Sequence, residues 1–251
     1  MNKKIYIATH KLFFPPKDDN YIPIIVGNNN IDIKNSVKDN TGDNISNLNP
    51  YFCEMTALYW IWKNSEINND DVVGMVHYRR YFSRNGKTPI SDSYISEIMQ
   101  KYDVILPRKR NYIITTIKDH YINAHHEKDL QSLYKIVEEM YPDYKITLNK
   151  VFDGRKLSLY NMFITRGYIF KEYCSWVFPI LFELNIKINR EGYDSYQSRV
   201  IGFLAERLFN VWFEFNRENY KIKFENVYNS EGENKLYKGI GLIRRQLLKG
   251  R

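Results

Sequence analysis

Two adjacent arginines are the strongest candidates for chemistry in this sequence. Arg79 and Arg80 follow His77 and Tyr78 in the stretch VVGMVHYRRYF, directly after an apolar run that is typical of a buried strand. Guanidinium groups bind phosphate oxygens in pairs and stay charged, so the two arginines, with His77 and Tyr78, could bind the diphosphate of a sugar nucleotide and neutralise it as it leaves, without a metal ion. The competing interpretation is an arginine pair that binds acids of the preceding long loop. Residue chemistry alone leaves the two interpretations nearly balanced.

A cluster of three histidines lies in HYINAHHEKD, residues 120–129. Helical spacing places His125 and Asp129 on one face and turns His120 and His126 elsewhere, so a metal site is not expected here. We keep His125 as a candidate contact for a substrate. The competing interpretation is an ordinary helix start whose acidic residues lie favourably near its N-terminus.

Asp194, in EGYDSYQSRV, stands at the start of the longest predicted helix, residues 193–215. Its first interpretation is an N-cap for that helix. A carboxylate held at a helix entrance beside a sheet edge could also serve as a general base for a sugar hydroxyl. Spacing does not decide between the two roles. Further along the same helix, the charged residues Arg199, Glu206 and Arg207 could be a solvated face or an ion-pair network.

The elements that must position these residues alternate between short strands and longer helices. The apolar run at 72–77 is too continuous for a half-exposed strand and is expected in a parallel sheet covered on both faces. The order of elements predicts an α/β domain with a mainly parallel sheet flanked by helices. Ligands bind such sheets at the carboxyl ends of the strands, which places HYRR at the functional edge. The predicted strands of this part are residues 4–9, 23–27, 72–77 and 102–107. Its predicted helices are residues 50–62 and 91–101.

The second half of the chain is more helical. It has predicted helices at 128–144, 167–184 (interrupted at Pro179) and 193–215, and strands at 157–165 and 219–228. We predict one domain over residues 1–235, with a nucleotide-binding half at 1–110 and an acceptor-side half at 111–235. Residues 236–251 form a basic amphipathic tail, which suits an anionic membrane surface or packs as an ordinary final helix.

Composition narrows the class of protein. The formal net charge of +8 implies an acidic partner, which could be nucleic acid, an anionic membrane or a phosphorylated small molecule. The chain lacks a phosphate loop, a GxSxG elbow, HExxH, CxxC and any Asp-x-Asp, the motif with which many sugar-nucleotide enzymes hold a divalent ion. No apolar run reaches eighteen residues, and no signal sequence is recognised, so we expect a cytoplasmic protein. Cys53 and Cys174 are expected to be buried, reduced thiols.

Several long blocks carry a resemblance to a known family. The blocks KIYIATHK, DNTGDNISNLNPYFCEMTALYWIWKN, DVVGMVHYRRYF, LYNMFITR and GYDSYQSRVIGFLAERLFNVW resemble a bacterial family from capsular and exopolysaccharide gene clusters. That family was long known only as a domain of unknown function, and its members are now assigned as glycosyltransferases, galactofuranosyl transfer included. The resemblance extends from about residue 4 to about residue 215.

The resemblance implies a type-A glycosyltransferase fold, a Rossmann-like sheet that holds a sugar nucleotide at its strand tips. HYRR would occupy the place where related enzymes carry Asp-x-Asp, which puts metal dependence in doubt. The resemblance places Ala8, Thr9 and His10 near the nucleobase and ribose. It places Asp43, Asn44 and Ser46 on the nucleotide side, and Asn161 near the sugar. Asp194 and Gln197 correspond to the acidic region that holds the general base.

The expected function is transfer of galactofuranose or another hexose from a UDP-sugar to a lipid-diphosphate-linked oligosaccharide, in capsule, exopolysaccharide or O-antigen synthesis. Arg79 and Arg80 would stabilise the departing diphosphate while Asp194 accepts the acceptor's proton, with inversion at the anomeric carbon. His125 and Arg199 are candidate acceptor contacts. No cofactor is expected to be required, although Mn²⁺ or Mg²⁺ remains open.

Two other classes of protein stay open. A nucleic-acid-binding module would fit the basic charge, but the lysines and arginines are dispersed and no recognised nucleic-acid motif occurs, so we expect no nucleic-acid partner. The other alternative is a non-catalytic subunit of a polysaccharide assembly complex. For the enzyme, we expect a cytoplasmic location, with peripheral attachment to the inner face of the cell membrane through the tail.

Overall fold

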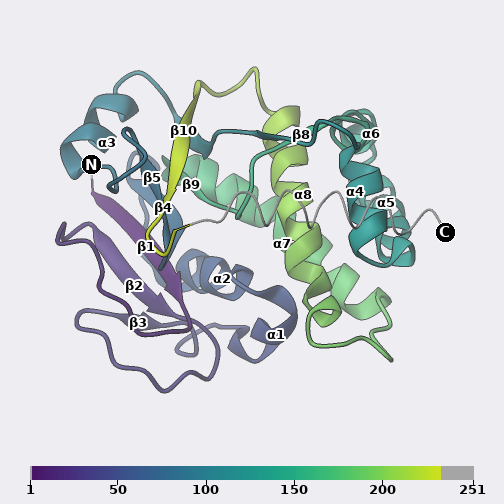
Figure 1. The fold of residues 1–251 in the computed structure, drawn as a ribbon, viewed down its shortest axis with the longest axis horizontal. Coiled ribbons are helices and arrows are strands. Elements are labelled where there is room, and N and C mark those ends of the chain that lie inside the picture. The colour runs from purple at the N-terminus through teal and green to yellow at the C-terminus, as the bar shows by residue number, and fades with distance from the viewer. Residues whose placement is uncertain (1, 233–251) are drawn as a thin grey trace.

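The computed structural model describes residues 2–232. They form an eight-stranded mixed sheet, a separate two-stranded ribbon and a set of packed helices (Figure 1). The strand order in the large sheet is β3-β2-β1-β4-β5-β10-β6-β9, and β4 also pairs with β9. β7 and β8 pair with each other as the ribbon. The strands are β1 (Lys3–Thr9), β2 (Tyr21–Ile25), β3 (Val37–Lys38), β4 (Val72–His77), β5 (Arg80–Ser83), β6 (Val104–Pro107), β7 (Arg110–Asn111), β8 (Lys156–Leu157), β9 (Phe163–Arg166) and β10 (Ile222–Asn229).

The continuous apolar runs of the central strands are explained by burial on both faces. In β1, Ile5 and Ile7 join one hydrophobic cluster, whereas Tyr6 and Ala8 join the other. Because successive side chains of a strand point to opposite faces, this division means that helices cover both sides of the sheet. The cluster with Ile5 and Ile7 also includes residues of α3 (Asp92–Met99). The cluster with Tyr6 and Ala8 includes residues of the larger helices.

The prediction of a mainly parallel sheet needs correction, because the sheet is mixed. β3, β2, β1 and β4 are parallel neighbours, but β4 pairs antiparallel with β9 over Val72–Met75 and with β5 at His77. Strands β4, β5, β10, β6 and β9 therefore form a closed circuit of pairings. The physical reason is the tight turn at Tyr78 and Arg79, which sends the chain back as β5 immediately after β4. Apolar patterning carries no signal for that reversal.

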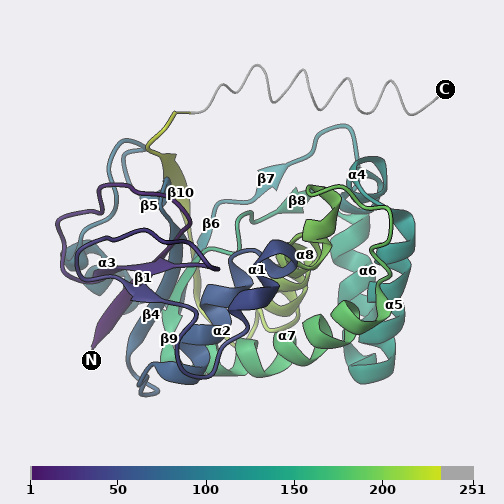
Figure 2. The same ribbon diagram turned by 90° about the horizontal axis from the view of Figure 1, so that it is seen from below.

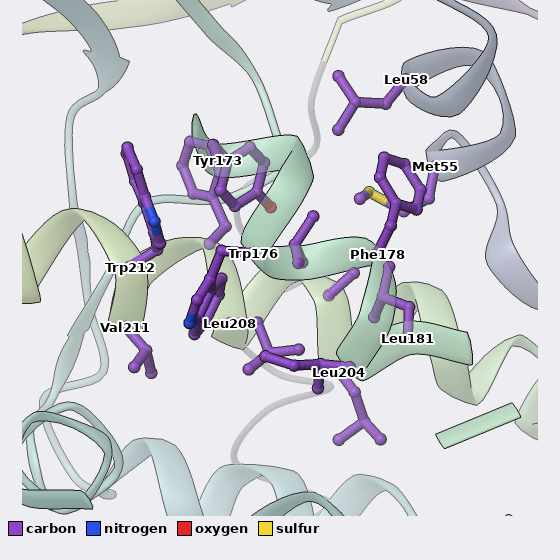
Figure 3. Close-up of a cluster of buried hydrophobic side chains, with 14 of the residues drawn as sticks. Met55, Leu58, Tyr173, Trp176, Phe178, Leu181, Leu204, Leu208, Val211 and Trp212 are labelled. Carbon is purple, nitrogen blue, oxygen red and sulfur yellow. The ribbon is translucent and has the colours of Figure 1, made fainter. Parts of the chain in front are cut away.

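Helices α7 and α8 form the middle of the molecule, between the sheet and the group α4, α5 and α6 (Figures 1 and 2). Side chains of α2, α7 and α8 interlock there, with Met55, Phe178 and Leu204 among them (Figure 3). The helices are α1 (Asn49–Phe52), α2 (Met55–Asn64), α3 (given above), α4 (Ile117–Ala124), α5 (Glu127–Met140), α6 (Lys145–Asp153), α7 (Gly167–Lys187) and α8 (Val200–Phe215), with short 3₁₀ helices η1 (Ser46–Leu48), η2 (Pro142–Tyr144) and η3 (Gln197–Arg199).

Two helix predictions are corrected by this arrangement. Pro179 does not interrupt α7, which continues through it for 21 residues. Proline removes one backbone hydrogen bond, but the flanking Phe178 and Ile180 are fully buried, and their packing stabilises the continuous helix. The predicted helix at 193–215 is shorter than expected, because α8 begins only at Val200.

The predicted helix at 50–62 is broken at Cys53, whose φ is +53°. The side-chain amide of Asn49 stabilises the break by donating to the carbonyl of Cys53 over 2.9 Å and to the hydroxyl of Thr56 over 3.0 Å. Gly202 of α8 packs directly against Cys53, since a Cβ at this glycine would lie 2.8 Å from Cys53 Sγ. The break and the close contact fix the position of the next residue, Glu54.

The strands of the predicted acceptor-side half, β9 and β10, belong to the same sheet as β1 and β4. Among the helices of residues 2–232, none has the length and apolar character that spanning a bilayer requires. The predicted tail at 236–251 lies outside the described residues.

Candidate active site

Two adjoining cavities open where β1 and β4 end. The larger has a volume of about 490 Å³ and the smaller about 320 Å³, and we call the two together the cleft. They share a common wall, made of Cys53, Glu54, His77, Tyr78 and Arg199. The cleft thus lies at the carboxyl ends of two parallel neighbours, as the order of elements predicts.

Arginines dominate the larger cavity. Its lining contains five of them, together with two carboxylates: Arg79, Arg80, Arg110, Arg199 and Arg207, with Glu54 and Glu206. Such an excess of guanidinium groups over carboxylates favours an anionic ligand.

Within residues 2–232, no ion pair is found between Arg79 or Arg80 and an acid of the long polar loop. Arg79 Nη1 forms an ion pair with Glu231 Oε2 at 2.9 Å, beyond the end of β10. The guanidinium of Arg80 lies 4.4 Å from the centre of the Tyr160 ring, and its buried Nε has no hydrogen-bond partner among residues 2–232. A buried donor without a partner is costly unless a ligand supplies one, so Arg80 is the best candidate contact for an anion.

A strained turn supports the floor of the cleft. Tyr160 and Asn161 have φ angles of +78° and +50°, a region that residues with a side chain seldom adopt. The Tyr160 carbonyl accepts from His77 Nε2 at 2.7 Å, and the Tyr160 N–H donates to Glu206 Oε1 at 2.6 Å. Asn161 Nδ2 donates to Glu54 Oε1 at 2.8 Å. Backbone strain that neighbouring hydrogen bonds hold in place is concentrated at functional sites. Cys53, on the common wall of the cleft, is a third residue with a positive φ angle.

Burial shifts the ionisation of groups in and beside the cleft. Desolvation lowers the pKa of His77, and the arginines beside it act in the same direction, although Glu54 opposes them. A neutral His77 therefore donates from Nε2 to the Tyr160 carbonyl and presents Nδ1 as an acceptor. Burial also raises the pKa of Glu206, a shift that Arg207 opposes.

His125 lines the larger cavity, as the sequence predicts for a substrate contact. Its Nδ1 donates to Gln197 Oε1 at 3.1 Å, and its ring lies 4.3 Å from that of Phe203. Gln197 Nε2 donates in turn to the carbonyl of Ala124. Gln197 therefore supports His125 from behind and lines neither cavity.

The structure brings most of the other predicted residues to the cleft. The smaller cavity is lined by the predicted nucleobase and ribose contacts Ala8, Thr9 and His10. The larger cavity is lined by Arg79 and Arg80. The common wall contains His77, Tyr78 and Arg199. Asn161 is buried behind Glu54 and does not itself line a cavity.

Three predicted nucleotide contacts lie away from the cleft. Asp43 and Asn44 are exposed, and Asp43 accepts a hydrogen bond from the hydroxyl of Tyr59. Ser46 is buried and donates to Asp39 Oδ1 at 2.7 Å. Asp39 also accepts from the N–H of Gly27, so Ser46 stabilises the loop around the smaller cavity without lining it.

Asp194 is likewise outside the cleft wall. Its carboxylate is exposed, and Oδ1 accepts from the backbone N–H of Gln197 at 2.7 Å at the start of η3. The next two residues, Ser195 and Tyr196, do line the cavities. Asp194 therefore stabilises the turn that leads into η3 and does not cap the long helix α8, whose N-cap residue is Arg199.

Several cleft residues were not singled out from the sequence: Glu54, Arg110, Tyr112, Tyr160, Glu206 and Arg207. Glu54 stands inside the predicted helix 50–62, where only the break at Cys53 turns it to the cleft. Tyr160 had a usable signal, because it directly precedes Asn161. Glu206 and Arg207 were noted only as part of a charged helix face.

No group of three or more His, Cys, Asp or Glu side chains in residues 2–232 has the arrangement of a metal site. The place at which the resemblance puts an Asp-x-Asp motif carries HYRR, and arginine has no atom that ligates a cation. The two arginines of HYRR therefore cannot take the metal-binding part of an Asp-x-Asp motif.

An α/β fold with a cationic cleft at its strand ends is typical of enzymes that bind phosphorylated substrates. The chain matches the family described as Domain of unknown function (DUF4422) over residues 4–218, and it belongs to that family. It is similar to the solved apo structure of WbbM, a bifunctional glycosyltransferase, with 30% sequence identity and a TM-score of 0.81. The match covers 93% of this chain and 46% of that one, so the chain spans about half the length of WbbM. No curated protein matches the chain.

Proposed function

We propose that this chain is a glycosyltransferase that uses a nucleoside-diphosphate sugar, with a UDP-sugar as the expected donor. The observation that carries the proposal is Arg80, which lines the cationic cleft at the end of β4 and whose buried Nε has no hydrogen-bond partner among residues 2–232. The similarity to WbbM over nearly the whole chain supports the class of reaction. Because WbbM is bifunctional and twice as long, the reaction of this chain is our inference.

The donor would lie across both cavities. The smaller one, bordered by Ala8, Thr9 and His10, has room for the nucleoside end, and the common wall leads from it to the arginines. Arg80 and Arg199 would bind the diphosphate there. Guanidinium groups would then stabilise the negative charge that develops on the leaving diphosphate, which is the role a divalent ion has in enzymes with Asp-x-Asp.

Glu54 is the general base that the geometry supports best. It lies on the wall common to both cavities, where donor and acceptor would meet. Asn161 holds Glu54 Oε1, and no hydrogen bond is found for Oε2 within residues 2–232. Both oxygens of Glu206, by contrast, are bound, one by the Tyr160 N–H and the other by Arg207 at 3.2 Å. The base role expected of Asp194 is therefore reassigned to Glu54 in this proposal.

The proposed reaction is a single in-line displacement. The acceptor hydroxyl attacks the anomeric carbon of the donor sugar and gives its proton to Glu54. The bond between that carbon and the diphosphate oxygen breaks, and the electron pair leaves with the diphosphate toward Arg80. One displacement inverts the anomeric centre. The part of the larger cavity that His125 lines would hold the acceptor.

For the acceptor we propose an oligosaccharide on a lipid diphosphate, in the synthesis of a capsule, exopolysaccharide or O-antigen. Galactofuranose or another hexose is the proposed sugar. The proposed location is the cytoplasm, with peripheral attachment to the inner face of the membrane. The proposal needs no metal ion, and complete loss of transfer in EDTA that Mn²⁺ restores would contradict that part of it.

A thermal-shift panel of nucleotide sugars tests the donor site. A ligand that binds only the native state raises the melting temperature, so the correct donor should stabilise the wild type in EDTA. Arg80→Ala should abolish that shift. Arg84→Ala is the matched control, because Arg84 lies just beyond β5, is exposed and lines neither cavity. An equal shift in Arg80→Ala and wild type would refute the assignment, and turnover with no dependence on Glu54 would refute the mechanism.

The same panel separates the alternative classes. A nucleic-acid-binding module would bind single strands or duplexes in a salt-dependent way and would show no shift with any nucleotide sugar. A non-catalytic subunit would bind sugar or nucleotide without turnover.

A further inference from the structure

Two loops that begin at the cleft carry exposed apolar side chains. Leu12 and Phe14 follow β1, and their exposed fractions are 68% and 101%. Ile113 and Ile114 lie between β7 and α4 and are 74% and 60% exposed. Single exposed apolar residues are ordinary on a protein surface. Two such groups that flank one site indicate an interaction surface.

Each loop leaves a different cavity of the cleft. The first leaves from His10 on the smaller cavity, and the second from Arg110 and Tyr112 on the larger one. We call residues 10–17 and residues 108–118 the two lips. The first lip is anchored by the Phe13 ring, whose centre lies 6.2 Å from that of Tyr78 on the common wall.

The second lip is anchored by Arg155, whose Nη1 donates to the carbonyl of Ile113 over 2.8 Å. This bond holds the backbone of the second lip while leaving the side chains of Ile113 and Ile114 in solvent. Both lips therefore present apolar tips from fixed positions beside the cleft.

The charge of the lips is entirely positive. Their sequences, HKLFFPPK and RKRNYIITTIK, contain no Asp or Glu and carry six cations: Lys11, Lys17, Arg108, Lys109, Arg110 and Lys118. Lys109 lies 3.4 Å from Glu214, and the other five are exposed. Acidic residues directly follow each lip, Asp18 and Asp19 after the first and Asp119 after the second, so the excess of positive charge belongs to the lips themselves.

Apolar tips surrounded by exposed cations match the chemistry of an anionic bilayer. Leucine, isoleucine and phenylalanine side chains gain free energy by entering the boundary of headgroups and acyl chains, and lysine and arginine are attracted to anionic headgroups. A nucleic acid would use the cations, but leucine and isoleucine have no aromatic face on which a base could stack. The four apolar side chains therefore favour a membrane.

We propose that the two lips dock the protein on an anionic membrane, with the mouth of the cleft toward the bilayer. Docking itself does not depend on the proposed function. Its consequence rests on that function, because a saccharide carried on a lipid would then reach the cleft from the membrane side. This surface is separate from residues 236–251, for which membrane attachment was predicted from the sequence.

Co-sedimentation of the full chain with vesicles tests the proposal without any donor or acceptor. Wild type should bind vesicles of equal parts phosphatidylglycerol and phosphatidylcholine, and should bind phosphatidylcholine alone far more weakly. Replacing all four apolar side chains by serine should lower the partition coefficient about tenfold or more. The four changes are Leu12→Ser, Phe14→Ser, Ile113→Ser and Ile114→Ser.

The matched control is Ile146→Ser with Ile186→Ser, because these side chains are 81% and 73% exposed but lie on α6 and α7. This double variant should bind vesicles as the wild type does. Unchanged binding of the four-serine variant would overturn the proposal and assign attachment to another part of the chain, residues 236–251 included. Absence of wild-type binding would also overturn it. The thermal shift with a nucleotide sugar should persist in the four-serine variant, so failure of docking and failure of the proposed function give different results.

Discussion

The side-chain amide of Asn161 donates to Glu54 Oε1 over 2.8 Å and joins two residues that are 107 positions apart. Asn161 is 1% exposed, so this bond is shielded from water. It links the strained turn before β9 to the carboxylate that follows the helix break at Cys53. Two backbone irregularities therefore meet at one acid, which is why we give Glu54 the central role in the proposed reaction.

Replacing Asn161 tests whether this bond positions Glu54. Asn161→Gly accepts the φ of +50° without strain but removes the amide, whereas Asn161→Ala removes the amide and keeps the strain. We expect both variants to lose about tenfold or more in kcat, because an unheld carboxylate is misplaced relative to its target. Melting temperatures should separate the two, with Asn161→Gly the more stable. Wild-type kcat in Asn161→Gly would show that the hydrogen bond has no part in positioning Glu54.

Two carboxylate variants distinguish Glu54 from Asp194 as the base. Glu54→Gln should lose about a hundredfold or more in kcat, because the amide accepts no proton from the acceptor. Asp194→Asn should stay close to wild type, since its amide oxygen still accepts from the Gln197 N–H. Both are measured by transfer from the donor found in the thermal-shift panel. The opposite pattern, with activity retained in Glu54→Gln and lost in Asp194→Asn, would return the base role to Asp194.

Glu206→Gln should act mainly on stability. Glu206 accepts from the Tyr160 N–H and from Arg207, whose side chain is only 4% exposed. Removing the charge would leave a buried guanidinium without its counter-charge, and we expect a loss of about 1–3 kcal/mol in the free energy of unfolding. Urea denaturation of the variant and wild type measures it. A stability equal to wild type would show that the negative charge of Glu206 is not needed beside Arg207.

The parts of the fold that could be predicted are those set by local patterns. The runs that became β1 and β4 have the apolar content of strands buried in a sheet, and the position of HYRR at the edge follows from the end of β4. The direction of β9 and β5 could not be predicted, because antiparallel pairing depends on a turn and on contacts between distant segments.

The residues of the candidate site also divide into those that a local sequence pattern predicts and those whose positions depend on distant contacts. Residues that directly follow strands, such as His10 and Arg80, were found from their positions in the sequence. Glu54 was missed because its position depends on the helix break at Cys53. That break needs room beside Gly202, which lies 149 positions after Cys53 in the chain. Asp43 and Asn44 were expected at the nucleotide but bind within their own loop region, beside Tyr59. Long-range packing, which a single sequence does not reveal, decided these cases.

Gly202→Ala should perturb the common wall of the cleft. The added Cβ would lie 2.8 Å from Cys53 Sγ and 3.0 Å from its Cβ, so one element must shift. We expect a loss of about 1–3 kcal/mol in stability from this overpacking, together with weaker donor binding. Cys53→Ala removes the sulfur, and the double variant should recover part of the loss, as a double-mutant cycle would measure. Strict additivity of the two changes would show that the contact does not limit the position of α8.

His77 should make the stability of the protein depend on pH. Burial lowers its pKa below the ordinary 6.5, so between these two values the unfolded chain binds a proton that the folded protein does not. The stability contributed by the neutral ring is therefore complete above pH 6.5 and is lost as the pH falls from 6.5 through the lower folded pKa. His77→Gln can still donate to the Tyr160 carbonyl but has no titrating group, so its melting temperature should fall less between about pH 7 and pH 5 than that of the wild type. His126→Gln is the control, because His126 is exposed and lines neither cavity. If His77→Gln and wild type show the same pH dependence, His77 binds protons alike in the folded and unfolded states, so burial does not lower its pKa and a neutral ring is not what the cleft requires.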